Sequence, residues 1–253
     1  MSRVNTTITG LDELIEGGFL ENDVILITGG PGSGKSTFGI QYIIGGIIEF
    51  NEPGIYVTLE ETPVRVIRNM WRYGWDLERH VRENMLRIIQ SNPIQFKDFI
   101  KKESHSSAIR VNPEGYMLEN IINQIQSMVN EIGAKRLFID SITSLKISCD
   151  ESMVRFTIME MIKNLENLDC TTVISSEVKE DYGSFTVEEY LCEGVIRLHI
   201  FRTGGTKERA VEILKMRGVK HDEFLHPYSI NDNGLIIYPN DSVIFDKENI
   251  INL

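Results

Sequence analysis

A glycine-rich segment that ends in a lysine and a hydroxyl residue carries the clearest chemistry in this sequence. Residues 29–36 read GGPGSGKS and fit the pattern GxxxxGK[ST] without deviation. The glycines let backbone N–H groups turn inward around phosphate oxygens, and the start of a following helix adds partial positive charge. The pattern therefore predicts a loop that binds a nucleoside triphosphate such as ATP, through Gly30, Pro31, Gly32, Ser33, Gly34, Lys35, Ser36 and Thr37.

Three residues are assigned to the phosphates and to a magnesium ion. Lys35 is expected to reach the β- and γ-phosphates and is counted among the catalytic residues, and the Ser36 hydroxyl is expected to ligate Mg²⁺. Asp140 is predicted as the second metal residue, because residues 137–139 (LFI) read as an apolar strand that ends in this carboxylate. The alternative for Asp140 is a turn or capping role.

Two adjacent acids, Glu60 and Glu61, follow the apolar segment 55–59. Hydrolysis needs a group that orients or deprotonates the attacking water, and the carboxyl ends of parallel strands line the ligand crevice. We therefore expect at least one of the two to be catalytic. The alternative is that both stabilise the first turn of a helix that starts near Pro63.

Seven basic residues gather between positions 197 and 220, opposed only by Glu208 and Glu212, in a chain of net charge −11. Within a strand, Lys215 and Arg217 would share one face, and His221 follows after a short turn. Such donors suit an anion, for example the γ-phosphate held by a neighbouring subunit. A solvated hairpin face and a nucleic-acid patch are the alternatives. The full set is Arg197, Arg202, Lys207, Arg209, Lys215, Arg217 and Lys220.

The elements that must position these residues alternate between strand and helix, which is typical of an α/β fold with a mainly parallel central sheet flanked by helices. A β-hairpin around Gly204-Gly205 is expected as a C-terminal extension. The polar segment 101–112 is expected to be a loop. Strands are predicted at 24–28, 55–59, 86–89, 136–140, 171–175, 195–202, 207–216, 228–230 and 235–238, and helices at 35–50, from 63, from 114 and at 151–168.

Length and composition agree with a globular, cytoplasmic protein. The 253 residues are 42% hydrophobic and 25% charged, enough to bury a core. The three cysteines form no CxxC pair, which favours a reducing compartment, and neither a signal peptide nor a membrane-spanning segment is expected. The acidic net charge would repel nucleic-acid phosphate, so neither nucleic acid nor a membrane is an expected partner.

Taken together, these motifs resemble KaiC-type ATPases of the RecA superfamily, in the single-domain form common in archaea. The resemblance covers nearly the whole chain. It begins at Thr9-Gly10-Leu11-Asp12 and includes the phosphate loop, Glu60-Glu61-Thr62-Pro63 and Ile139-Asp140-Ser141. It ends with Val187-Glu188-Glu189-Tyr190 and Lys215-Met216-Arg217-Gly218 with His221.

The resemblance implies a RecA-like P-loop fold for residues 1–239, followed by a tail at 240–253. It implies a homo-oligomeric ring, usually a hexamer, with ATP and Mg²⁺ at subunit interfaces. Lys215, Arg217 and His221 would then contact the nucleotide of the neighbouring subunit. Glu60 and Glu61 would be the paired catalytic glutamates, with Glu60 preferred. Autophosphorylation is left open.

The expected function is hydrolysis of ATP to ADP and phosphate, acting as a regulatory or signalling switch on an unidentified protein partner. Two alternatives remain at this point. One is a nucleotide-gated assembly module with little turnover. The other is a DNA-dependent motor like RadA, which the net charge disfavours.

Overall fold

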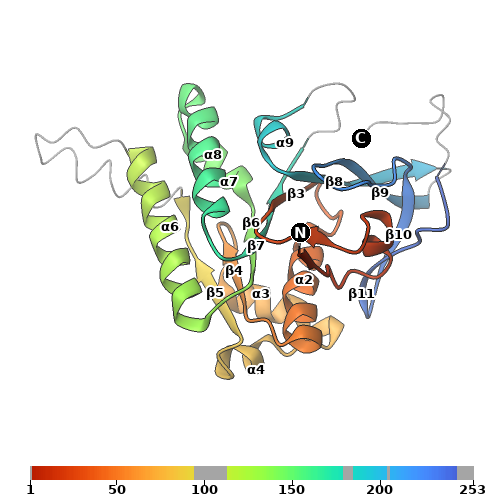
Figure 1. The fold of residues 1–253 in the computed structure, drawn as a ribbon, viewed down its shortest axis with the longest axis horizontal. Helices are drawn as coiled ribbons and strands as arrows, with labels where there is room; N and C mark the ends of the chain where they lie inside the picture. The colour runs from red at the N-terminus through yellow and green to blue at the C-terminus, as the bar shows by residue number, and fades with distance from the viewer. Residues whose placement is uncertain (1, 94–112, 179–184, 204–205, 244–253) are drawn as a thin grey trace, which may run out of the picture.

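A nine-stranded mixed sheet with helices on both faces forms the body of the molecule (Figure 1). The structure is a computed structural model, and it describes residues 2–93, 113–178, 185–203 and 206–243. The predicted loop at 101–112, the turn at 204–205 and most of the predicted tail lie outside the described residues. In the part of the chain that is described, no helix combines the length and the apolar character that crossing a bilayer requires.

The strand order in the sheet is β11-β10-β9-β8-β3-β7-β6-β4-β5. The six strands from β8 to β5 run parallel, and the remaining three continue the sheet with antiparallel pairing. The predicted mainly parallel sheet with a hairpin extension is therefore confirmed. The bounds are β3 Val24–Gly29, β4 Gly54–Thr58, β5 Leu86–Gln90, β6 Arg136–Asp140, β7 Thr171–Ser176, β8 Gly194–Thr203, β9 Thr206–Met216, β10 His226–Asn231 and β11 Gly234–Ile237.

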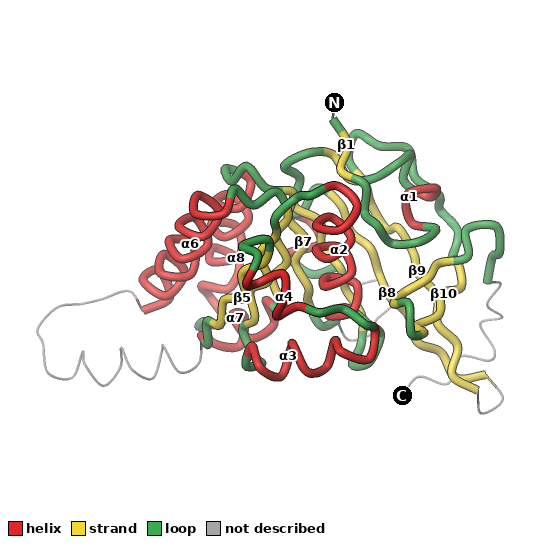
Figure 2. Tube along the Cα trace, turned by 90° about the horizontal axis from the view of Figure 1, so that it is seen from below, coloured by secondary structure: helices red, strands yellow, loops and turns green. Residues whose placement is uncertain are grey.

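Two apolar clusters, one on each face of the sheet, form the core. Helices α1 to α4 lie on one face and α6 to α9 on the other, as Figures 1 and 2 show. The small pair β1 (Arg3–Val4) and β2 (Phe19–Leu20) lies apart from the main sheet. The helices are α1 Leu11–Leu14, α2 Lys35–Phe50, α3 Pro63–Met70, η1 Trp71–Tyr73, α4 Leu77–Arg82, α6 Pro113–Ile132, α7 Ile142–Ser148, α8 Glu151–Glu166 and α9 Val187–Leu191.

The long apolar helices and strands form where the sequence predicts them, because burial on both faces leaves a continuous apolar signal. All six residues of β3 and all five of β4 are buried. Short elements such as α1, α4, α7 and α9 were not predicted. They hold too few turns to show a helical period, and tertiary contacts decide them.

The parallel register brings the chemistry-bearing strand ends to one edge of the sheet. Thr58 at the end of β4 pairs with Asp140 at the end of β6, and Thr28 of β3 pairs with Ser176 of β7. Residues 29–36 leave the same edge directly after β3. Glu60, Asp140 and the phosphate loop are therefore neighbours although they lie far apart in the sequence.

A β-bulge in the β8–β9 hairpin reverses which face of the sheet the side chains at the end of β9 occupy. Val195 pairs with Lys215 and Ile196 with Ile213, so Leu214 is an extra residue on β9. Ile213 packs in the α2-side cluster, whereas Leu214 packs against the opposite one. A single inserted residue reverses which face the following side chains occupy. Lys215 therefore lies on the α9 side of the sheet, unlike Arg209 earlier in the strand.

Asp23 lies just before β3, at the end of this strand opposite the phosphate loop, and its ionisation offers a test of the packing there. Burial, together with the nearby Glu193 and Glu166 carboxylates, raises its pKa from 3.8 to about 6. The ionised form is thus disfavoured in the folded state, so its stability cost is present above pH 6 and disappears as the pH falls through 6 toward 4.

We expect Asp23→Asn to raise the free energy of unfolding at pH 7.5 by about 1 kcal/mol, less than the full shift implies because Asp23 is partly exposed. The gain should vanish near pH 4. Urea unfolding of both proteins at the two pH values measures it. An equal gain at both would show that the carboxylate charge is not the cause.

Candidate nucleotide-binding site

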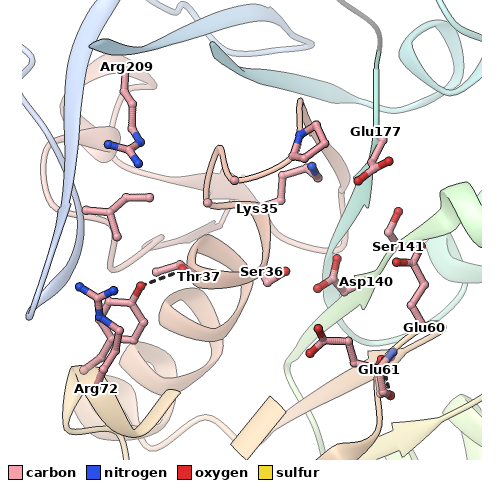
Figure 3. Close-up of a pocket in the computed structure, with 16 residues that line it drawn as sticks. Lys35, Ser36, Thr37, Glu60, Glu61, Arg72, Asp140, Ser141, Glu177 and Arg209 are labelled. Carbon is pink, nitrogen blue, oxygen red and sulfur yellow. Dashed lines mark hydrogen bonds between the residues drawn. The ribbon is translucent and has the colours of Figure 1, made fainter. Parts of the chain in front are cut away.

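A cavity of about 650 Å³ opens at the carboxyl edge of the sheet, beside the phosphate loop (Figure 3). That volume suits a ligand of nucleotide size. The lining comes from the loop, from the ends of β4, β6 and β7, and from η1, β9 and β10. It consists of Pro31, Gly32, Gly34, Lys35, Ser36, Thr37, Thr58, Glu60, Glu61, Arg72, Tyr73, Asp140, Ser141, Glu177, Arg209 and Ile230.

The loop holds a conformation that requires glycine. Gly34, immediately before α2, has φ 102°, and a Cβ atom there would lie 2.5 Å from Ile230 Cδ1. Gly32 also has positive φ, and at Gly30 a Cβ would meet nothing within 4 Å. The loop thus leaves open space beside the N-terminus of α2, where free N–H groups and the helix dipole favour a phosphate. These residues fit a triphosphate.

Lys35 is folded back onto the loop. Its Nζ donates to the Gly29 carbonyl (2.7 Å) and to the Gly30 carbonyl (3.1 Å). Burial lowers the pKa of Lys35, an effect opposed by the carboxylates of Glu177, Asp140 and Glu60. An incoming phosphate would supply an anionic acceptor for this ammonium, which spends two of its three N–H donors on neutral carbonyls.

Asp140 has a donor on each carboxylate oxygen. The Tyr56 hydroxyl donates to Oδ2 (2.7 Å) and the Ser175 hydroxyl to Oδ1 (2.6 Å). Tyr56 also interacts with the Ser36 side chain, and burial followed by the Asp140 charge raises the Tyr56 pKa. The buried Tyr56 side chain thus lies beside both predicted metal residues. A hydroxyl and a carboxylate held together are hard oxygen donors and fit Mg²⁺.

The two glutamates differ in how they are held. Glu60 Oε1 accepts from the Ser144 hydroxyl of α7 at 2.6 Å. Glu61 is fixed by its backbone N–H, which donates to Thr58 Oγ1 (2.9 Å), while its carboxylate accepts from the Asn69 amide at the longer distance of 3.5 Å. Both line the cavity. In Figure 3 the Glu61 side chain extends on the Ser36 side, and Glu60 turns toward the segment after Asp140.

Several cavity residues were missed by the sequence analysis. Tyr73 is anchored by its hydroxyl, which lies 3.2 Å from Thr37 Oγ1, and Arg72 and Ile230 also line the cavity. None of them belongs to a short motif. Glu177 could have been found, because the run Ser175-Ser176-Glu177 ends a predicted strand at this edge.

The basic residues counted as one group are divided by the structure. Arg209 points into the cavity of its own chain (Figure 3). Lys207 Nζ lies 3.7 Å from where a Cβ on Gly32 would be. By contrast, Lys215, Arg217 and His221 are not among the residues that line this cavity. The bulge in β9 thus separates the basic group into two parts, with Lys215 and Arg217 together on one face.

Arg209 is expected to contact the nucleotide bound by its own chain. Its Nε is buried and, among the described residues, has no hydrogen-bond partner. We expect Arg209→Gln to weaken ATP binding about tenfold, because a charge-assisted hydrogen bond contributes about 1.5–3 kcal/mol. Equilibrium titration with ATP measures it. Arg202→Gln, an exposed arginine on the same hairpin, is the control, and equal affinities for the two variants would contradict the assignment.

A glycine loop between a central parallel strand and a helix, with a carboxylate at the end of a nearby strand, defines the fold as that of a P-loop nucleoside triphosphatase. The family model "ATPase: KaiC" matches residues 4–242. The chain therefore belongs to the KaiC ATPase family.

Individual relatives agree with the family model. The UPF0273 protein MJ1359 of Methanocaldococcus jannaschii is 36% identical over 242 residues, covering 94% of this chain and 97% of that protein. The circadian clock oscillator protein KaiC of Synechococcus elongatus is 34% identical over 94% of this chain, which spans 44% of that protein. The crystal structure of the KaiC-like protein PH0186 from Pyrococcus horikoshii superposes with a TM-score of 0.80 at 34% identity, covering 94% of this chain and 99% of that one.

The resemblance to KaiC and the RecA-like α/β fold are thus confirmed. The roles of the individual site residues stay predictions.

Proposed function

We propose that this protein binds Mg·ATP in the cavity and hydrolyses it to ADP and phosphate, within a homo-oligomeric ring whose nucleotide sites lie between subunits. The observation that carries the proposal is the meeting, at one cavity, of the phosphate loop with Asp140, Glu60 and Glu61. The name of the Synechococcus elongatus relative, a circadian clock oscillator protein, supports a regulatory rather than a metabolic role.

Different residues of the chain are proposed to bind the phosphates, the magnesium ion and the base. The loop N–H groups and Lys35 hold the phosphates, and Arg209 approaches them from β9. Ser36 and Asp140 would hold Mg²⁺, which when bound neutralises charge on the phosphate oxygens. Tyr56 fixes the position of Asp140 through its 2.7 Å hydrogen bond. A planar base would lie against Arg72 and Tyr73 on the far side of the cavity.

Glu60 is the better-placed general base. A base must be held in one orientation to act on water, and the Ser144 hydroxyl holds one Glu60 oxygen while the carboxylate still lines the cavity. Glu61 supports it through its charge.

A neighbouring copy is proposed to complete the site. The acids of the cavity leave it in need of cations that stabilise charge on the transferred phosphoryl group. Lys215 and Arg217 lie outside the cavity of their own chain but on a half-exposed surface, from which they can serve the cavity of the next subunit. Such a head-to-tail contact generates a ring when the rotation between neighbouring subunits closes. A ring of six is the size that the family resemblance implies.

The direct test combines phosphate release in Mg·ATP with the solution mass of the protein with and without Mg·ATP. We expect steady turnover, and a mass that corresponds to a ring when nucleotide is present. Binding and assembly without phosphate release would instead identify a nucleotide-gated assembly module.

Glu60→Gln is expected to lower turnover about 100-fold or more, since a positioned general base contributes about 10²–10⁴. Glu61→Gln should cost less, and the double variant should be inactive while still binding ATP. Single-turnover phosphate release measures the three. A larger loss for Glu61→Gln than for Glu60→Gln would reverse the assignment of the base.

A further inference from the structure

The short helix α9 buries two charged side chains, which is unusual for a surface helix of 5 residues. Glu188 is 1% exposed and Glu189 is 4% exposed. Glu188 Oε1 accepts from the Ser176 hydroxyl (2.8 Å) and pairs with Lys146. Glu189 pairs with Arg197 of β8 and accepts from the Thr186 N–H (2.7 Å). Two ion pairs therefore attach α9 to the body of the molecule.

The other end of α9 holds the cations that we assign to the neighbouring site. Lys215 Nζ donates to the Glu189 carbonyl (2.7 Å) and to the Tyr190 carbonyl (3.3 Å). Arg217 donates to the same Tyr190 carbonyl (3.2 Å) and to Glu193 Oε1 (3.1 Å). Free carbonyls at a helix C-terminus are natural partners for cations. The position of α9 thus determines where Lys215 and Arg217 point.

The groups that Glu188 contacts belong to the magnesium end of the cavity. Ser176 follows Ser175, whose hydroxyl donates to Asp140 Oδ1 (2.6 Å). Lys146 lies on α7, the helix that begins directly after Asp140 and Ser141. Lys146 also donates to the Ser176 hydroxyl (3.1 Å). The anchor of α9 is therefore built from the two elements that flank Asp140.

A buried ion pair adds little net stability compared with an apolar pair of similar volume, but it is directional and specifies one arrangement. For α9 that arrangement is the one in which the Glu189 and Tyr190 carbonyls face β9.

We infer that Glu188 is a positioning residue for the reaction in the neighbouring subunit: it fixes α9 to the ends of β7 and α7, and α9 presents Lys215 and Arg217 to the next copy's cavity. This inference rests on the proposed function, in which the two cations act in trans. Its partner is a second copy of this chain. Glu188 is not among the residues that line the cavity, and its effect passes through α9.

The test uses mixed oligomers of two variants. One variant can supply only the in-trans cations, and the other can supply only a hydrolysing cavity. A cation donor carries Glu60→Gln and Glu61→Gln, so it binds ATP without hydrolysing it but keeps Lys215 and Arg217. A pocket donor carries Lys215→Ala and Arg217→Ala, so it keeps the glutamates. Each alone should be inactive, and the mixture should release phosphate in Mg·ATP. Glu188→Gln is then added to one partner or to the other.

We expect Glu188→Gln in the cation donor to lower turnover of the mixture about tenfold or more, because small misplacements of a charged group cost that much. In the pocket donor it should change turnover less than about twofold. Glu151→Gln, an exposed glutamate on α8, is the control in both placements. Ser176→Ala, a milder change at the same anchor, should show the same asymmetry, and the solution mass of each mixture establishes that the variants assemble.

Three results would overturn the inference while leaving the proposed function intact. These are a loss only in the pocket donor, an equal loss in both placements, and no loss in either. The first would mean that Glu188 acts on the cavity of its own chain through Asp140. If the parent mixture itself recovers no activity, the in-trans function fails, and the role of Glu188 fails with it.

Discussion

Replacing both Lys215 and Arg217 by methionine is expected to lower ATP turnover about 10³-fold, while ATP affinity falls less than about tenfold. Cations supplied by a neighbouring subunit act mainly on the charge that develops during phosphoryl transfer, and arginines in that role contribute about 10³–10⁵ to the rate. The phosphate loop, Lys35 and Arg209 remain to bind the ground state. Turnover and affinity are expected to separate because Arg209 lines the cavity of its own chain, whereas Lys215 and Arg217, beyond the bulge, do not.

Measuring turnover at different protein concentrations tests separately whether the site is shared between subunits. If the site is shared between subunits, turnover per subunit in the wild-type protein should fall on dilution, as the ring dissociates. The double variant should stay about 10³-fold below the undiluted wild-type turnover at every concentration. Lys220→Met, at an exposed lysine in the segment after β9, is the control for removing a basic residue. Wild-type turnover that is independent of concentration down to a monomeric mass would contradict the shared site.

The second large effect is expected at Lys35. Lys35→Met should weaken ATP binding about 100-fold, which corresponds to about 3 kcal/mol, because charge-assisted contacts to the phosphates are lost. Methionine keeps most of the side-chain volume, so the loop should stay intact. Titration calorimetry with Mg·ATP and with Mg·ADP measures the loss.

The same variant should not unfold more easily in the absence of nucleotide. Burial disfavours the charged ammonium, as its lowered pKa indicates, so an apolar side chain of similar size is tolerated and can be stabilising. Lys163→Met, an exposed lysine on α8, is the control for removing a lysine from a helix. Unchanged ATP affinity in Lys35→Met would remove the basis of the proposed site.

Much of the fold follows from local patterns. The strand at β3, the helix α2 and the strand β4 were predicted within one or two residues, because each is long, apolar or punctuated by glycine and proline. The short helix α9 carries no such pattern. Its sequence VEEYL would be expected on the surface with its glutamates in water, and only the facing Lys146 and Arg197 make burial of the two acids possible.

The bulge at Leu214 is a second feature, this time in strand β9, that the local sequence pattern does not predict. Alternation along residues 207–217 would place Lys207, Arg209, Lys215 and Arg217 on one face of an ideal strand. One extra residue reverses that alternation partway along the strand, and the local sequence does not predict the bulge. The difference between a residue that serves its own cavity and one that serves a neighbour is therefore a property of strand register.

What the sequence by itself determined is the local chemistry: a phosphate loop, a carboxylate at a strand end, a pair of glutamates and an α/β alternation. Each is encoded in a few adjacent residues, whose backbone preferences and spacing act within one turn or one strand. Only the tertiary structure decided which groups support them, namely Tyr56 between Ser36 and Asp140, Ser144 on Glu60, Arg209 in the cavity and α9 beneath Lys215 and Arg217. Those contacts join residues tens of positions apart, and they exist only because the packing of the sheet brings the segments together.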